Sequence, residues 1–134
     1  MTTSTATTTD VDVVRALFGA FASGDLAGLS DLLRADATWH HHNDDRHGGI
    51  HRGADAVVAY LTESALVTAG TLHAEPQSVL ADGQGHVAVP LRLSASRPDG
   101  RTIDDAQVVL VTVDGGRIRA IEQFVGDPAA VAAF

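Results

Sequence analysis

Apolar residues spaced three and four positions apart predict two short helices near the start of the chain. The first covers about residues 10–22 and the second about residues 26–34. Ser23-Gly24-Asp25 lies between them and supplies a stop followed by a new N-cap, while Thr9 and Asp12 resemble a capping box. The residues of the two apolar stripes are Val14, Leu17, Phe18 and Phe21, then Leu26, Leu29, Leu32 and Leu33.

A short strand and a third helix are predicted next. Thr38 and Trp39 favour extended structure, so we expect a strand over residues 37–42 and then an irregular loop of about ten residues. Gly53-Ala54-Asp55 opens a helix that Gly70 ends. Its buried stripe consists of Val57, Val58, Leu61, Ala65 and Leu66.

The second half of the chain carries repeated β signals. Glycine-containing connectors separate four apolar segments and are typical of hairpin turns, which predicts an antiparallel meander. A short helix from Asp127 to Phe134 ends the chain. This order of elements predicts an α+β fold with its helices on one face of a curved sheet. The strands are expected at 72–80, 87–96, 102–113 and 118–125, and the turns at 82–85, 98–100 and 114–116.

Composition excludes several classes of partner. The formal charge of -8 repels nucleic acid, and no basic run offsets it. The sequence has no cysteine, which fits a reducing compartment, and no apolar run reaches the roughly 20 residues of a membrane span. We therefore expect a cytoplasmic protein with a disordered tail over residues 1–9 and one domain over residues 10–134.

One predicted strand is apolar on both faces. In Val108-Val109-Leu110-Val111, successive residues point to opposite sides of the sheet, yet all four are apolar. One side is expected to meet helices or a cavity, and the other a second subunit. The sequence thus predicts a homodimer that forms through the sheet.

Candidate chemistry is concentrated in residues 39–53. This stretch holds five of the seven histidines and the only tryptophan. On a strand, Trp39 and His41 share one face while His40 and His42 share the other. The second pair has a metal-ligand spacing that His47 and His51 are near enough to complete, so a zinc, iron or copper site is possible.

Several segments together resemble a known family. They are 21–26 between the first helices, 37–40 on the first strand, 51–57 opening the third helix, and then 79–82, 97–101, 114–118 and 126–131. Their order and spacing resemble the nuclear transport factor 2-like superfamily, in its ketosteroid isomerase and SnoaL-like polyketide cyclase branch. The resemblance implies a cone-shaped α+β fold, in which a curved antiparallel sheet and three helices enclose an apolar pocket for a hydrophobic small molecule.

The resemblance also implies roles for residues of this chain. The catalytic base of ketosteroid isomerase falls on His41, and its two oxyanion donors fall on Leu17 and Val108. Gln107 and Gln123 are further candidate donors, although glutamines on such strands more often face outward. The expected pocket wall is Leu17, Phe21, Trp39, Tyr60, Val108, Leu110 and Phe124.

Three functions follow from these residues. The first is a SnoaL-like isomerase, cyclase or lyase in which His41 performs acid/base catalysis on a carbonyl-bearing or polyketide-like compound. The second is a binding module of the same fold that leaves its ligand unchanged. The third is a metal-dependent enzyme built on His40 and His42. No organic cofactor is expected, because no glycine-rich phosphate cradle follows a strand.

Overall fold

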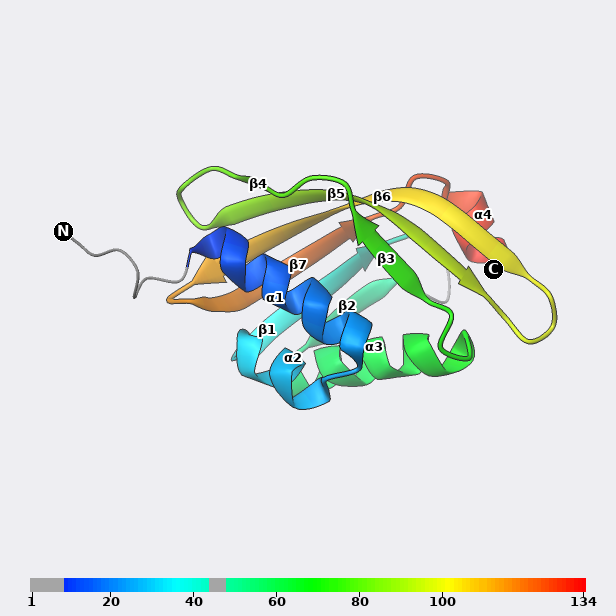
Figure 1. Cartoon of the computed structure of the whole chain (residues 1–134), viewed down its shortest axis with the longest axis horizontal. Helices are drawn as coiled ribbons and strands as arrows, with labels where there is room; N and C mark the ends of the chain where they lie inside the picture. Colours follow the sequence, from blue (N-terminus) through cyan, green and yellow to red (C-terminus); the bar gives the residue numbers. More distant parts are fainter. Residues whose placement is uncertain (1–8, 44–47) are drawn as a thin grey trace.

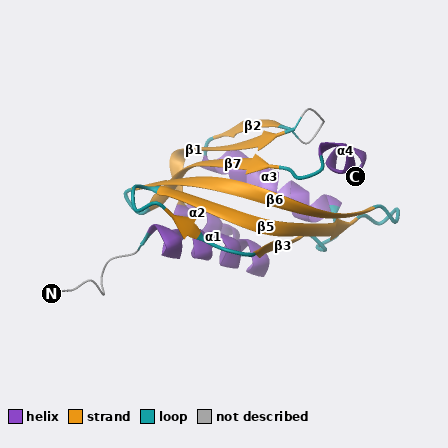
Figure 2. Cartoon of the chain, turned by 90° about the horizontal axis from the view of Figure 1, so that it is seen from above, coloured by secondary structure: helices purple, strands orange, loops and turns teal. Residues whose placement is uncertain are grey.

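Helices cover one face of a curved sheet in the computed structural model, which describes residues 9–43 and 48–134. Figure 1 shows α1 (Asp10–Ser23), α2 (Leu26–Leu32) and α3 (Ala54–Val67) on the concave side of the sheet. In the view from above, the strands lie in front of these helices (Figure 2). The α+β class with a curved sheet is confirmed.

The sheet has seven strands in the order β2-β1-β7-β6-β5-β3, with β4 also paired to β5. Strands β5, β6 and β7 form the predicted meander, because β5 pairs antiparallel with β6, and β6 with β7. Strand β1 lies parallel to β7. The sheet is therefore mixed, whereas a wholly antiparallel sheet was expected. The strands are β1 (Leu33–His42), β2 (Gly49–Arg52), β3 (His73–Pro76), β4 (Leu80–Ala81), β5 (His86–Ser96), β6 (Thr102–Asp114) and β7 (Arg117–Phe124).

Helix α1 begins and ends where local chemistry predicts. The Thr9 hydroxyl accepts a hydrogen bond from the backbone N–H of Asp12, and the Asp12 carboxylate accepts one from Thr9, completing the capping box of α1. Gly24 ends α1 with φ of 70°, a left-handed conformation that suits glycine. No helix in the described part of the chain is long and apolar enough to cross a membrane.

Several boundaries differ from the sequence prediction. Strand β1 begins at Leu33, so α2 ends two residues early. The segment 43–52 was expected to be irregular, but β2 forms within it by antiparallel pairing with β1. The strand expected over 72–80 is divided into β3 and β4, which pair with different parts of β5. The last helix, α4, covers Pro128–Ala133.

The main core lies between the concave face of the sheet and the helices. Along β6, buried and exposed residues alternate almost without exception, which is the two-residue period of a strand with one buried face. Val109, Val111 and Val113 point toward the helices, where they meet Val14 and Leu17 of α1 in one cluster. This inner face also bounds a cavity.

Candidate active site

A cavity of about 150 Å³ lies between the inner face of the sheet and helices α1 and α3. Its wall is mostly apolar, with polar side chains from α3 and the sheet. Five residues predicted for the site line it, namely Leu17, Phe21, Trp39, His41 and Tyr60. These residues are far apart in the sequence, and the fold brings them together.

Strand β1 positions the two residues of greatest chemical interest. Because side chains alternate across a strand, Trp39 and His41 both point inward, as predicted. His41 is only 3% exposed, although its imidazole is polar. A buried imidazole in an apolar cavity is a group that can exchange a proton with a bound compound.

A chain of side-chain hydrogen bonds crosses the inner face of the sheet from β1 to β6. The indole Nε1 of Trp39 donates to Oε1 of Gln123 over 3.0 Å, and the Tyr60 hydroxyl donates to the same oxygen over 3.3 Å. Gln123 Nε2 donates to Oε1 of Gln107 over 2.7 Å. Gln107 Nε2 then donates to Oδ2 of Asp105 over 2.9 Å.

The direction of this chain is determined by its two ends. An indole can only donate and an ionised carboxylate can only accept, so neither glutamine amide can be turned round without losing two bonds. Asp105 is itself held by the backbone N–H groups of Gly126 and Asp127, at 3.0 and 2.9 Å. These bonds use one hydrogen of each glutamine NH₂ group. The second hydrogen of each NH₂ group makes no further hydrogen bond within the described residues.

The contribution of Gln107 and Gln123 to the cavity wall was not predicted from the sequence. They were expected to face outward, but Gln107 and Gln123 are 4% and 8% exposed and both line the cavity. Each glutamine lies two positions from a buried residue of its own strand, Val109 or Ile121, and therefore points inward with it. The sequence does not reveal the direction of either partner, so it gave no signal for the glutamines.

Arg97 is a cavity residue that the sequence did not identify as part of the site. Its guanidinium lies over the Phe134 ring, 4.9 Å from the centroid, and the side chain lines the cavity. Among the described residues, its buried Nε atom has no hydrogen-bond partner. Arg97 therefore brings a positive charge and an available donor to a mostly apolar wall.

Three residues predicted for the pocket wall lie outside it. Val108, Leu110 and Phe124 are 36%, 42% and 38% exposed and lie on the outer face of the sheet. For the first two, the apolar pattern of β6 did not reveal which residues face inward. For Phe124, a register shift between β6 and β7 adds one residue after Ile118, and this irregularity reverses which side chains face inward. Val108 is also the position that the resemblance assigned to an oxyanion donor, and because it faces outward, this position cannot contribute to the cavity.

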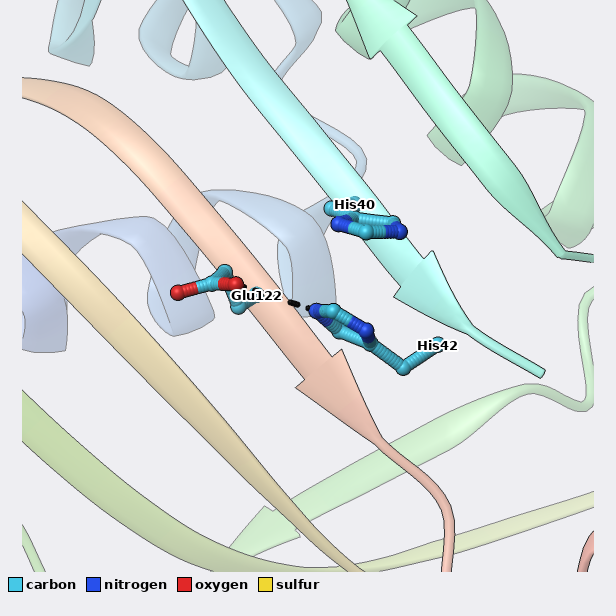
Figure 3. Close-up of side chains that lie close together, drawn as sticks. All are labelled: His40, His42 and Glu122. Atoms are coloured by element: carbon cyan, nitrogen blue, oxygen red, sulfur yellow. Dashed lines mark hydrogen bonds and ion pairs between the residues drawn. The ribbon is translucent and has the colours of Figure 1, made fainter.

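The histidines predicted as metal ligands are divided between the two faces. His40 and His42 share the outer face, and Figure 3 shows them beside Glu122 of β7. His51 lies opposite Trp39 in the β1–β2 pairing and stacks on Tyr60, with ring centroids 4.1 Å apart. It therefore cannot join His40 and His42, and burial lowers its pKa. His47 lies outside the described residues.

Comparison with known proteins identifies the family. A model of the SnoaL-like domain matches residues 14–121. The chain belongs to the SnoaL-like family. An uncharacterized protein of Mycobacterium tuberculosis is 40% identical to this SnoaL-like chain over 125 residues, covering 93% of it and 95% of the mycobacterial protein.

Solved structures agree with this assignment. Bal32a, from a soil-derived mobile gene cassette, matches with a TM-score of 0.89 and 29% identity, covering 93% of this chain and 95% of Bal32a. A nuclear transport factor 2-like protein of Burkholderia xenovorans LB400 matches with a TM-score of 0.78 and 25% identity, covering 92% and 93% of the two chains. The SnoaL-like resemblance and the nuclear transport factor 2-like fold are thus confirmed.

Proposed function

We propose that this SnoaL-like protein binds a small carbonyl compound in its cavity and that His41 acts on it as an acid/base catalyst of the isomerase, cyclase or lyase type. The observation that carries the proposal is the presence of a nearly buried imidazole in the same cavity as two oriented glutamine amides. An apolar pocket with a few convergent polar groups is the usual form of a small-molecule site.

The proposed chemistry divides the work between these groups. His41 takes a proton from the carbon next to the carbonyl, and the electron pair of that C–H bond moves onto the oxygen as an enolate. The remaining hydrogens of the Gln107 and Gln123 amides are donors for that oxygen. The imidazolium then returns the proton to another carbon of the conjugated system, which completes an isomerisation with no loss of atoms.

The size of the cavity supports a compound of one ring. An apolar protein cavity of about 150 Å³ accommodates benzene, and the cavity here has about that volume. Ligand sites for larger compounds measure about 300–1,000 Å³. Single-ring enones and ketones are therefore the first compounds to test.

Arg97 favours compounds that also carry an acidic oxygen. Its guanidinium has an available buried donor and lies in the wall of the same cavity. A carboxylate or phenolate on the ligand would give this donor a charge-assisted partner, which is stronger than a neutral hydrogen bond. We thus expect an acidic single-ring ketone to bind better than its neutral analogue.

The experiment measures proton exchange on a model compound. The protein is incubated in D₂O with cyclohex-2-enone and with a carboxylated analogue, and exchange next to the carbonyl is followed by ¹H NMR. We expect the protein to accelerate exchange and His41→Gln to lower the rate by about 10²–10⁴-fold, with ligand affinity and circular dichroism unchanged. A matched control is His73→Gln, because His73 is exposed on β3.

Two results would contradict the assignment. If His41→Gln exchanges protons as fast as the natural protein, His41 is not the base. If the natural protein binds these ketones but accelerates no exchange, the second function applies, namely a binding module. Its support is that Gln107 and Gln123 do not ionise, line the cavity and are held in place by hydrogen bonds to Asp105 and to each other. In that case His41→Gln would change only affinity.

The proposal includes a homodimer that forms through the outer face of the sheet. Val108, Leu110 and Phe124 define an outer apolar patch, and no helix of the described chain covers it. Exposed apolar surface on adjacent strands is typical of a protein–protein interface. A second copy would bury these side chains and leave the cavity on the opposite face accessible.

A further inference from the structure

The outer face carries a group of metal-ligating side chains that the proposed catalysis does not use. His40 and His42 occupy alternate positions of β1, so both point outward. Strand β7 runs parallel to β1 with Glu122 opposite His40 and Phe124 opposite His42. The register of two neighbouring strands therefore brings two imidazoles and one carboxylate to the same place.

The three side chains are within reach of one ion. Nε2 of His42 lies 3.0 Å from Oε1 of Glu122, and the ring centroids of His40 and His42 are 3.6 Å apart. One candidate ligand atom from each residue lies within 4.8 Å of the other two. Bonds of about 2.0–2.1 Å to a tetrahedral ion place ligand atoms roughly 3.3 Å apart, so small rotations would satisfy the geometry.

We propose that His40, His42 and Glu122 bind a divalent transition-metal ion of the zinc class. Two histidines and one glutamate are a ligand set that zinc uses when a fourth position is left for water. Imidazole nitrogen selects zinc, copper and nickel over magnesium and calcium, which prefer oxygen. The proposed ligand set differs from the one expected from sequence, because it includes Glu122 and leaves out His51, which stacks on Tyr60 away from His40 and His42.

The surroundings support a preformed site. Both strands are interior to the sheet, because β2 and β6 flank them. Phe124 stacks on His42 with centroids 4.4 Å apart and an angle of 5° between the rings, which restricts the imidazole. In Figure 3, His42 and Glu122 point toward each other across the two strands, with His40 alongside. Ligands on rigid elements need little rearrangement to bind an ion.

The position of the site separates it from the cavity. His40 and His42 point away from His41, so the ion would not touch a compound bound on the inner face. It would instead lie beside Phe124 of the outer apolar patch. A metal bound there would affect association through that face and not the chemistry of His41.

The test uses the full chain purified without a histidine tag and treated with a chelator. Co²⁺ is titrated while visible absorption is recorded, and Zn²⁺ is then added in competition. We expect one ion per chain with the absorption of a low-coordinate Co²⁺ site, which Zn²⁺ removes. His40→Gln, His42→Gln and Glu122→Gln should each weaken binding by about tenfold or more.

Two controls make the result specific. Nδ1 of His86 lies 2.7 Å from Oδ2 of Asp82, so these residues are a histidine–carboxylate pair without a second imidazole. His86→Gln should leave metal affinity unchanged, as should His41→Gln on the inner face. Binding that Glu122→Gln leaves within twofold of the natural value would overturn the site. The absence of stoichiometric Zn²⁺ or Co²⁺ binding would do the same, and since this substitution is nearly isosteric, misfolding would not obscure the answer.

Discussion

The two faces of strand β1 carry the same residue type in opposite settings. His41 points into the cavity and is almost fully buried, beside side chains whose hydrogen bonds have a single direction. His40 and His42 point outward, where both are half-buried and within reach of a carboxylate. Three consecutive histidines are therefore divided between the cavity and the outer face of the sheet.

This difference separates two kinds of recognition. The inner face is enclosed, so its polar groups must be satisfied by one another or by a bound compound. The outer face is open to solvent, so its polar groups can remain hydrated until an ion or another chain arrives. One sheet can thus hold a small-molecule cavity and an association surface without conflict.

The largest expected effect is on the free energy of unfolding, in a comparison of one aliphatic residue from each face of the sheet. Ile121 is buried on the inner side of β7, and Leu110 is exposed on the outer side of β6. Ile121→Ala should lower the free energy of unfolding by about 2–5 kcal/mol, because it leaves a space that the core cannot fill. Leu110→Ala should change it by less than about 0.5 kcal/mol at concentrations where the chain is monomeric. Urea unfolding measures both, and equal losses would contradict the assignment of the faces.

The second comparison uses neighbouring residues of β7. Gln123→Leu removes the acceptor of the Trp39 indole and the donor to Gln107, so buried polar groups lose their partners. We expect a loss of about 1–3 kcal/mol, measured by urea unfolding. Glu122→Gln on the outer face is the matched control and should change stability by less than about 0.5 kcal/mol. A Gln123→Leu variant as stable as the natural protein would show that the hydrogen-bond chain is not a stabilising feature.

The third comparison concerns association. Leu110→Glu introduces a charge into the outer apolar patch, and an unpaired charge buried in the proposed dimer interface should cost about 2 kcal/mol or more. We expect the dissociation constant of the dimer to rise by about 30-fold or more, measured by sedimentation equilibrium. Thr62→Glu, on α3, is the control and should leave the dimer unchanged. Dimers that survive Leu110→Glu with unchanged affinity would rule out this face.

The smallest expected effect is a dependence of stability on pH. Burial lowers the pKa of His51, whose Nε2 has no hydrogen-bond partner among the described residues. The unfolded chain therefore binds a proton at His51 more readily than the folded chain does. The free energy of unfolding should fall as the pH is lowered through about 6.5 toward the folded pKa, and should be insensitive to His51 above that window.

His51→Gln provides the measurement. Thermal unfolding at pH 7.5 and at pH 5.5 should differ less for this variant than for the natural protein. The exposed His73→Gln variant should keep the natural dependence. If His51→Gln leaves the difference between the two pH values unchanged, His51 is not the group responsible.

Local patterns in the sequence predicted most of the fold. Helical stripes, the Thr9 capping box and glycine turns depend on neighbours in the chain, so they could be identified without tertiary contacts. Alternation along a strand likewise predicted that Trp39 and His41 share one face, whereas the inward direction of that face was implied by the family resemblance. Strand β2 could not be predicted, because only Ile50 of its four residues favours extended structure strongly, and pairing with β1 is what makes the segment a strand.

The site was predicted less completely than the fold. Which residues of β6 face inward cannot be read from Val108–Val111, where every residue is apolar, and Phe124 lies beyond a register shift that the sequence does not reveal. Glu122 was not identified as a companion of His40, because the two are neighbours only through the parallel pairing of β1 with β7. Arg97 likewise was not identified, because it and Phe134, on which its guanidinium lies, are 37 residues apart and meet only in the folded chain.

The position of Trp39 in the cavity wall has a consequence for the fluorescence of the protein. Trp39 is the only tryptophan of the sequence, and its indole lines the cavity. All tryptophan fluorescence therefore originates at the cavity wall, with Tyr60, the only tyrosine, at a ring-centroid distance of 5.8 Å as an energy donor. A compound that enters the cavity should change the wavelength or the intensity of that emission. Ligands can therefore be screened by the protein's own fluorescence, without a label.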